Sequence, residues 1–298
     1  MEICPKIKDL STYKEVMLLS EEKGIPIQFS LGNKDMENLG ETSGSRRGIL
    51  IVINPEAYEN EVVYIHELLH AKYHLLEYPI ASFYAKIEFP QTILAWVASL
   101  HNSIQHTFIY KEMKKIGVEQ VEINKDFATS ILESARTNTA DTRHMVNAMN
   151  FFEYYLRFPN AIDVLKKDKQ IYPSEGFDLF LEMLTVIEKP LTTHSDFRNA
   201  YIKMFRIIDA YLLKNINMSM NLNHYICVDP VFSSDELNDV ASKHLQVIDY
   251  PQCEHYFIID KKDGQCSFFI SKNKGKFNRE MVNTYLNNSL IHEWMQYI

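Results

Sequence analysis

The chain has 298 residues, of which 46% are hydrophobic, and a formal net charge of -8. This length and composition suffice to bury a large core and are not those of a disordered chain. The acidic balance, without a long basic run, lacks the electrostatic pattern of a protein that binds nucleic-acid phosphates indiscriminately, so we expect no nucleic-acid partner.

The amino-terminal residues MEICPKIKDL place a proline and several charges where a secretory signal would need an apolar stretch. No apolar run in the sequence approaches the roughly 20 residues that span a bilayer. We therefore expect a cytoplasmic protein that does not cross or bind a membrane.

Four cysteines, Cys4, Cys227, Cys253 and Cys266, show no CxxC pairing in a chain too large to need disulfide bonds, so we expect reduced thiols. A second metal site is an alternative for the last three. It would combine Cys227 with His224, or Cys253 and Cys266 with His255, but these spacings match no standard zinc site.

The first predicted elements are a helix over 10–23 that stops at Gly24, and two strands over 25–31 and 48–55. The connector between the strands is polar and rich in Gly and Ser. It is too long for a tight hairpin, so we expect a mobile flap or a small irregular element there, either as a solvated loop or as a gate for substrate.

Two strong helical patterns follow the second strand. The sequence after Pro55 reads as one helix of about five turns that ends before Pro79. Pro90 opens the next helix, which basic residues and Gly117 close. From about 124 to 217 the pattern stays helical, interrupted by Pro159, Pro173 and Pro190.

The last part of the chain changes character near residue 217. It predicts a strand, a hairpin that turns through Asp263 and Gly264, and a closing helix. The expected fold is α+β and predominantly helical. We expect a catalytic core over 1–120, a helical extension over 121–217 that completes the cleft, and a small α/β subdomain over 218–298.

The sharpest motif is His66-Glu67-Leu68-Leu69-His70, an HExxH sequence in the middle of a predicted helix. Histidines four residues apart lie one turn apart on the same face, where both can reach one Zn²⁺ at about 2.0 to 2.1 Å. Zinc lowers the pKa of its bound water and polarises a scissile carbonyl, and Glu67 can take the proton as general base. The alternative is an ordinary helix that carries two surface histidines beside a glutamate.

The order of elements up to residue 117, together with YENEVVYIHELLHAKYH around the motif, resembles the zincin metallopeptidases, such as the intracellular ImmA/IrrE type. This resemblance implies a minimal zincin core, a small sheet plus the HExxH helix, and zinc-dependent peptide hydrolysis. The ImmA/IrrE type implies regulatory cleavage of a protein partner. The metzincin pattern HExxHxxGxxH is excluded, because Tyr73 and Leu76 occupy the glycine and third histidine positions.

The third metal ligand has to come from elsewhere in the chain. His74 lies about 12 Å along the helix from His66, too far to share one ion, and reads as a supporting or surface residue. The resemblance implies that, as in gluzincins, the third ligand is a glutamate on the next helix. That helix offers instead two pairs one turn apart, His101 with Gln105 and Asn102 with His106.

We choose His106 as the third ligand, because imidazole is the better ligand for zinc. His101, Asn102, Gln105 and Tyr110 are candidates to support the ligands by hydrogen bonds. Carboxylate alternatives remain, and an oxyanion stabiliser is expected to be a Tyr, His or Arg. The carboxylates are Glu88, Glu112 and Glu133, and the oxyanion candidates are Tyr110 and His144.

The predicted function is a zinc metallopeptidase that hydrolyses peptide bonds of an intracellular protein or peptide, with Glu67 as general base and His66, His70 and His106 as metal ligands. Two alternatives stay open. One is a non-enzymatic regulatory or interaction protein on a zincin scaffold. The other is a metal hydrolase that acts on a non-peptide amide.

Overall fold

A computed structural model of the chain describes residues 3–36, 38–45, 47–83, 91–118, 133, 144–159, 163, 166, 174–272 and 277–295. These residues are mostly helical and include three small sheets, so the expected α+β, predominantly helical fold is confirmed. No described helix combines the length and apolar character that a bilayer crossing requires.

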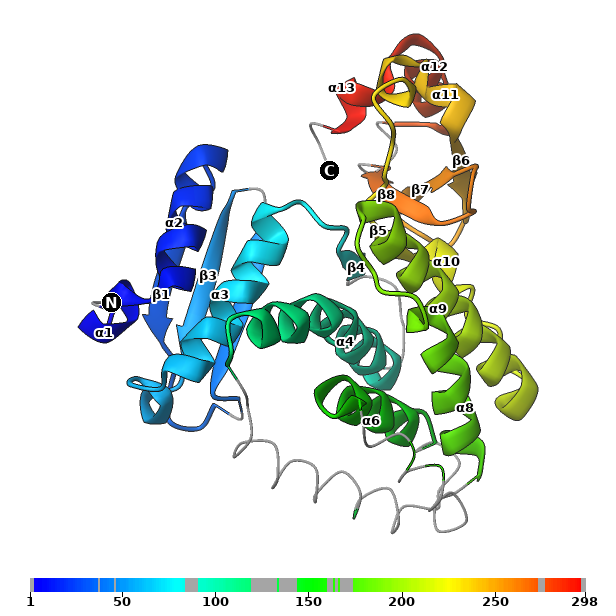
Figure 1. The fold of residues 1–298 in the computed structure, drawn as a ribbon. Coiled ribbons are helices and arrows are strands. Elements are labelled where there is room, and N and C mark those ends of the chain that lie inside the picture. Colours follow the sequence, from blue (N-terminus) through cyan, green and yellow to red (C-terminus); the bar gives the residue numbers. More distant parts are fainter. Residues whose placement is uncertain are drawn as a thin grey trace. The chain divides into compact units, whose positions relative to one another are not determined.

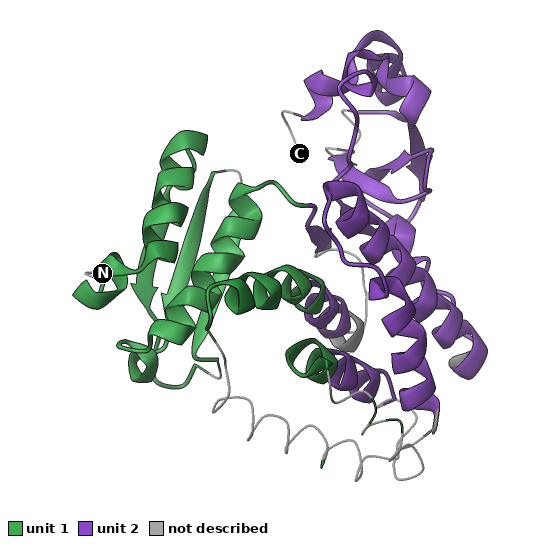
Figure 2. Cartoon of the chain, viewed as in Figure 1, with its two compact units in different colours: residues 1–78, 102–137, 153–167 green, residues 79–101, 138–152, 168–298 purple. Residues whose placement is uncertain are grey.

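The chain forms two compact units, each assembled from separate stretches of sequence (Figure 2). The division interrupts two long helices, after residues 101 and 152. Unit 1 holds residues 1–78, 102–137 and 153–167, and unit 2 holds residues 79–101, 138–152 and 168–298. The three-part division at residues 120 and 217 stays a prediction.

Unit 1 begins with helices, a sheet and the helix that carries the HExxH motif (Figure 1). Its elements are α1 (Pro5–Asp9), α2 (Ser11–Lys23), β1 (Ile27–Leu31), β2 (Gly40–Ser45), β3 (Gly48–Ile53), the 3-10 helix η1 (Pro55–Ala57) and α3 (Glu61–Leu75). Gly24 ends α2 in the left-handed conformation with φ 66°, as the sequence predicts.

The sheet of unit 1 has the strand order β1-β3-β2, with β1 parallel and β2 antiparallel to the central β3. Alternate residues of β3 face one side, because successive side chains of a strand point to opposite faces. Ile49, Ile51 and Ile53 are buried there against α2 and α3, which both cover this face. Leu50 points to the opposite face and is 39% exposed.

The described residues 32–36, 38 and 39 of the connector between the two predicted strands are loop, turn and bend, in line with a small irregular element, and a mobile flap stays a prediction. Residues 40–45 instead form β2, which pairs with β3 from Gly40 opposite Ile53 to Ser45 opposite Gly48. Its composition, GETSGS, gives little strand propensity. Pairing with the central strand determines the conformation, and the two glycines let the backbone approach α3 closely.

The helix predicted from Pro90 to Gly117 is α4 (Gln91–Lys115), and Gly117 follows it with φ 73°. The predicted helical middle is mostly helical where the structure describes it, and residues 188–193 around Pro190 interrupt the helices. The continuous helical stretches are α6 (His144–Arg157), α8 (Ser174–Leu184) with the 3-10 helix η5 (Thr185–Ile187), and α9 (His194–Ile216). Most of residues 119–143 and 160–173 lie outside the described residues.

The carboxyl-terminal part of unit 2 contains the predicted strand, hairpin and helix. Gly264, with φ 74°, lies in the hairpin turn as expected. Its elements are α10 (Leu222–Tyr225), β5 (Ile226–Val228), the 3-10 helix η6 (Glu236–Asn238), α11 (Ala241–His244), β6 (Leu245–Asp249), β7 (His255–Asp260), β8 (Cys266–Ser271), α12 (Arg279–Asn288) and α13 (Ile291–Met295). β5 pairs with β4 (Ala81–Phe83), and β6-β7-β8 form an antiparallel sheet.

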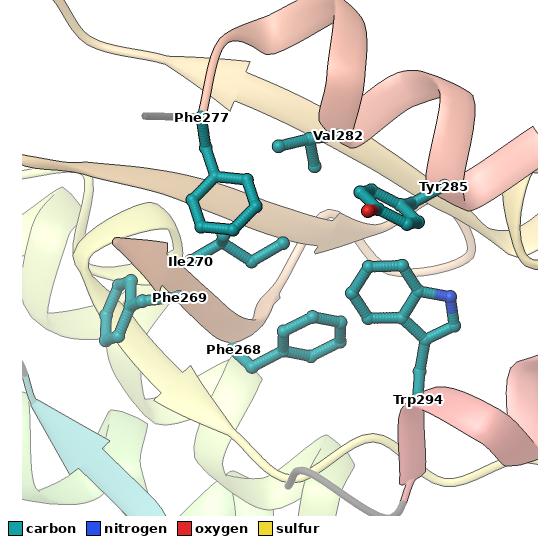
Figure 3. Close-up of a pocket in the computed structure, with 7 residues that line it drawn as sticks. All are labelled: Phe268, Phe269, Ile270, Phe277, Val282, Tyr285 and Trp294. Carbon is teal, nitrogen blue, oxygen red and sulfur yellow. The ribbon is translucent and has the colours of Figure 1, made fainter. Parts of the chain in front are cut away.

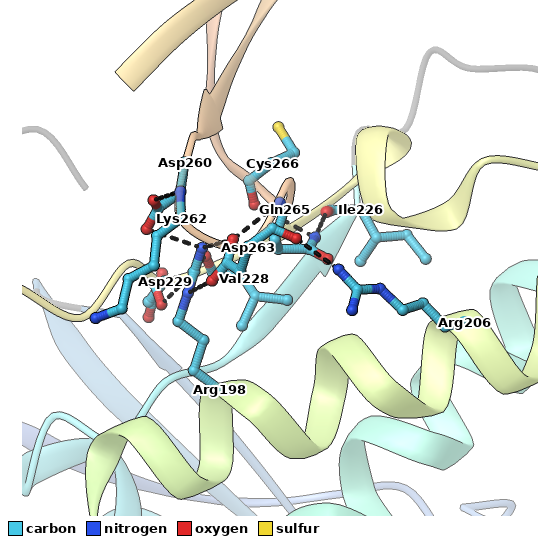
Figure 4. Close-up of polar contacts among 10 residues, drawn as sticks. All are labelled: Arg198, Arg206, Ile226, Val228, Asp229, Asp260, Lys262, Asp263, Gln265 and Cys266. Carbon is cyan, nitrogen blue, oxygen red and sulfur yellow. Dashed lines mark hydrogen bonds and ion pairs between the residues drawn. The ribbon is translucent and has the colours of Figure 1, made fainter. Parts of the chain in front are cut away.

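Aromatic packing and one buried arginine hold together the carboxyl-terminal part of unit 2. A half-open pocket of about 260 Å³ lies between β8 and the last two helices, and Phe268 stacks on Trp294 at its wall (Figure 3). Arg198 of α9 is buried and donates to the backbone carbonyls of Val228 and Asp229 and to the carboxylate of Asp263 (Figure 4). This single side chain ties α9 to β5 and to the hairpin turn.

Candidate metal centre

Helix α3 presents His66 and His70 on one face. Asn60 caps the helix by accepting from the amides of Val62 and Val63, which fixes where the first turn begins. The Nε2 atoms of the two histidines are 3.2 Å apart. A tetrahedral ion with bonds of about 2.0 to 2.1 Å separates its ligand nitrogens by about 3.3 Å, so this spacing suits one shared ion.

Helix α4 brings His106 to the same point. Ile109 and Met113 of α4 pack against Ile65 and Leu69 of α3, and this apolar contact places the two helices together. The His106 ring centroid lies 5.0 Å from that of His66 and 5.3 Å from that of His70. One nitrogen from each of the three histidines lies within 4.8 Å of the others.

The free nitrogen of His106 shows that the cluster suits a metal ion. Its Nε2 atom is buried and has no hydrogen-bond partner among the described residues. A buried polar atom without a partner is costly in a folded protein, and an ion is one way to satisfy it. Three histidines therefore lie close enough to bind a metal ion.

Hydrogen bonds on the opposite side of the rings select the tautomer that binds metal. Nδ1 of His70 lies 2.7 Å from Oε1 of Gln105, and Nδ1 of His106 lies 2.7 Å from Oε1 of Glu153. Both partners accept, so Nδ1 carries a proton in each ring, and in the neutral imidazole this leaves the lone pair on Nε2. Burial lowers the pKa of His66 and His70 well below the usual value, so both stay neutral at neutral pH.

Glu153, near the end of α6, was not among the candidate residues. Its Oε1 atom accepts from Nδ1 of His106, from the hydroxyl of Tyr110 at 2.8 Å and from Nε of Arg157 at 3.1 Å. Its Oε2 atom accepts from Ser103 at 3.0 Å. Burial alone would raise the pKa of Glu153, but the interactions with His106, Arg157 and Tyr110 outweigh it and lower the pKa.

Glu67 directly follows His66 in α3 and is buried against β2. The hydroxyl of Thr42 donates to its Oε2 atom at 2.7 Å, and the α-carbon of Gly40 is so near that an added Cβ would lie 2.7 Å from Oε1. Burial raises the pKa of Glu67 to about 7, although the hydrogen bond from Thr42 opposes the shift. A carboxylate with a pKa near 7 can both accept and return a proton at neutral pH.

Two of the four candidate supporting residues contact the cluster in the structure. Gln105 and Tyr110 contact the cluster, through His70 and through Glu153 and His106 respectively. His101 belongs to unit 2, where its Nδ1 atom accepts from the Tyr201 hydroxyl at 2.8 Å and from the amide of Ala81. Asn102 is exposed. The contacts described for His101 are with Tyr201 and Ala81 and not with a ligand, so support of the ligands by His101 and Asn102 stays a prediction.

The physical reason for the different surroundings of His101 and His106 is the helical repeat of α4. Five residues correspond to about 140° around a helix, so His101 and His106 cannot face the same neighbour. Packing of α4 on α3 decides which of them meets the motif. Asn102 shares the side of His106 but lies one turn earlier, outside the buried contact.

The alternative ligands have other partners or lie outside the described residues. Glu112 pairs with Lys72 and Lys115, and the exposed Glu133 is not part of the cluster. Glu88 lies outside the described residues. His144 is buried in unit 2. His74 lies beside β2, where an added Cβ on Gly44 would contact its ring.

The cysteines do not form a disulfide. Cys227 and Cys266 are buried thiols whose sulfur atoms are 3.4 Å apart, and Cys4 and Cys253 are free as well. The alternative of a second metal site through these cysteines finds no support in the described part of the chain, where the histidine triad is the only group of metal-ligating side chains.

No protein-family model matches this chain, and comparison with curated proteins and with solved structures gives no match either. The function is therefore inferred from the geometry of the histidine cluster.

Proposed function

We propose that this protein is a zinc metallopeptidase that hydrolyses peptide bonds of a protein or peptide substrate inside the cell. The observation that carries the proposal is the convergence of three imidazoles, together with a buried glutamate that directly follows His66 in the same helix. His66, His70 and His106 would hold the ion, and three histidines are a common protein ligand set for catalytic zinc. The motif in α3 supplies two of these ligands and the glutamate.

When bound at such a site, zinc activates water and polarises a carbonyl group. The side chains of the chain do the remaining work. Glu67 would accept the proton of the attacking water and return it to the leaving amine. Thr42 directs one carboxylate oxygen of Glu67 by its hydrogen bond.

Tyr110 has a different role from the oxyanion stabiliser considered from the sequence. Its hydroxyl donates to Oε1 of Glu153 at 2.8 Å, so its proton is engaged in the network behind His106. We assign it to positioning that ligand. This leaves substrate contacts to residues nearer Glu67.

Metal analysis of purified variants tests the ligand assignment. We expect close to one zinc per chain in the wild type and loss of zinc in His66→Ala, His70→Ala and His106→Ala. His101→Ala is the matched control, because it removes a histidine from the same helix as His106 but from outside the cluster. Full zinc content in His106→Ala would reject the third ligand.

Comparison of cells that express the wild type or Glu67→Gln tests hydrolysis. Glu67→Gln should keep the zinc and abolish cleavage, because the amide cannot accept the proton. New protein amino termini that appear only with the wild type would identify substrates. If zinc is bound and no such fragment forms, the alternative of a non-enzymatic protein on the same scaffold replaces the peptidase.

A further inference from the structure

The end of α6 carries a buried carboxylate that contacts the metal cluster through one ligand. Glu153 lies 47 residues beyond His106 in the sequence, and its Oε1 atom is 2.7 Å from Nδ1 of that histidine. The Glu153 side chain is 12% exposed and that of His106 is 3% exposed. The hydrogen bond is therefore shielded from water, where it is strongest.

The carboxylate is held in one orientation by partners on both of its oxygens. Three residues of α4 donate to it: Ser103 to Oε2, and His106 and Tyr110 to Oε1. Arg157, one turn further along α6, donates to Oε1 and balances the charge. The donors lie on consecutive turns of α4. The carboxylate therefore fixes the rotation of the His106 ring, and it also holds the end of α6 in position.

We propose that Glu153 is a positioning residue that holds His106 in the tautomer and orientation that bind metal, and thereby couples metal binding to the packing of the end of α6 on α4. This inference rests on the proposed function, in that the ion is zinc at the three histidines. A carboxylate that accepts from a ligating imidazole increases the basicity of the ligand, and loss of such a partner typically lowers metal affinity 10- to 100-fold.

The coupling is reciprocal by thermodynamic linkage. If packed α6 improves zinc binding, then zinc must stabilise packed α6 to the same extent. Gln105, which supports His70, lies on α4 itself, so among the contacts of the described residues it is the bond from His106 to Glu153 that links a ligand to α6. Bound zinc should thus slow hydrogen exchange at residues 153–157 as well as in α3.

Zinc affinity of three variants, measured by competition with a chromophoric chelator, tests the positioning role. We expect Glu153→Gln to weaken zinc binding about ten-fold and Glu153→Ala by up to about 100-fold. Ser103→Ala is the matched control, because it removes a hydrogen bond from the other oxygen of the same carboxylate and leaves His106 untouched. Because the bond from His106 to Glu153 remains, Ser103→Ala should weaken zinc binding less than Glu153→Gln does.

Co²⁺ absorption gives a readout that a purely structural role would not change. The visible spectrum of the Co²⁺ protein reports ligand geometry, so it should differ from wild type in Glu153→Gln and differ less in Ser103→Ala. A Glu153→Gln protein with wild-type zinc affinity and an unchanged Co²⁺ spectrum would overturn the inference, even if its thermal stability were reduced.

Hydrogen exchange of the wild-type protein, with and without zinc, tests the coupling to α6. This test does not depend on the folding of any variant. Zinc-dependent protection of both α3 and residues 153–157 is expected. Protection of α3 alone would overturn the coupling while leaving the proposed peptidase intact. A wild-type protein that binds no zinc would instead overturn both proposals, so the two failures are distinguishable.

Discussion

The hydroxyl of Thr42 lies 2.7 Å from Oε2 of Glu67 and also donates to the backbone carbonyl of the same residue at 3.1 Å. Strand β2 therefore holds the glutamate of the HExxH motif at two points. The contact depends on close approach of the strand to α3. Gly40 and Gly44, which flank Thr42 on the same face, make that approach possible because neither has a Cβ.

The first prediction concerns Gly40. In Gly40→Ala the new methyl group would lie 2.7 Å from both Cγ and Oε1 of Glu67, so the carboxylate has to move. A displacement of about 1 Å in a catalytic group costs about 100-fold in rate, so under the proposed function we expect hydrolysis to fall by 10- to 100-fold with zinc content preserved. Activity and zinc are measured on the same preparation.

Gly44→Ala is the matched control for this strand. It adds the same methyl group on the same face, but against the ring of His74, 2.8 Å from Cγ. Activity should be affected much less than in Gly40→Ala. Equal losses in the two variants would mean that distortion of β2, and not displacement of Glu67, explains the effect.

The second prediction concerns the pH dependence of stability in the metal-free protein. The pKa of Glu67 is raised by burial from 4.5 to about 7 in the folded state. Between these values the folded protein keeps a proton that the unfolded chain releases, so burial of Glu67 costs stability that grows as pH rises through this window. Glu67→Gln removes the cost.

Thermal unfolding in a chelator measures this effect. Glu67→Gln should stabilise the metal-free protein at about pH 8, by on the order of 2 kcal/mol, and by much less at about pH 5. His292→Gln, a substitution at an exposed position, controls for nonspecific effects of the buffer. A stability difference that is the same at both pH values would contradict the assigned pKa shift.

The third prediction concerns Gln105. Gln105→Leu keeps the side-chain volume but removes the acceptor 2.7 Å from Nδ1 of His70, and so should weaken zinc binding about ten-fold. Gln105→Glu retains an acceptor and should bind zinc at least as tightly as the wild type. Asn102→Leu, at an exposed position of the same helix, should leave the affinity unchanged. Competition with a chelator measures all three variants.

The fourth prediction concerns Arg198 in unit 2. Arg198→Met would leave the buried Asp260 and two backbone carbonyls without their cation. Breaking a buried ion pair from one side costs about 3 to 5 kcal/mol. We expect a loss of this size in the free energy of unfolding, measured with urea.

Arg206→Ala provides the comparison, because Arg206 is exposed and donates to the backbone carbonyl of Asp263. Its loss should cost no more than about 1 kcal/mol. Similar values for the two arginines would show that burial of the Arg198 network is not what stabilises this part of the fold.

Several features were predictable from the sequence because they depend on neighbours along the chain. The spacing of His66 and His70 sets both rings on one side of α3 by helix geometry alone. Gly24, Gly117 and Gly264 mark two helix ends and a hairpin turn because each has the positive φ that other residues avoid. These are local properties, and the corresponding expectations are confirmed.

The other features of the candidate site were decided by contacts between residues far apart in the sequence. His101 and His106 have the same chemistry and lie on the same helix, and only the packing of Ile109 and Met113 on α3 selects His106. Thr42 reaches Glu67 only because a Gly- and Ser-rich connector joins the edge of a sheet. Glu153 reaches His106 only when α6 packs on α4. Sequence spacing determines which side chains share one element, whereas burial of apolar faces determines which elements meet.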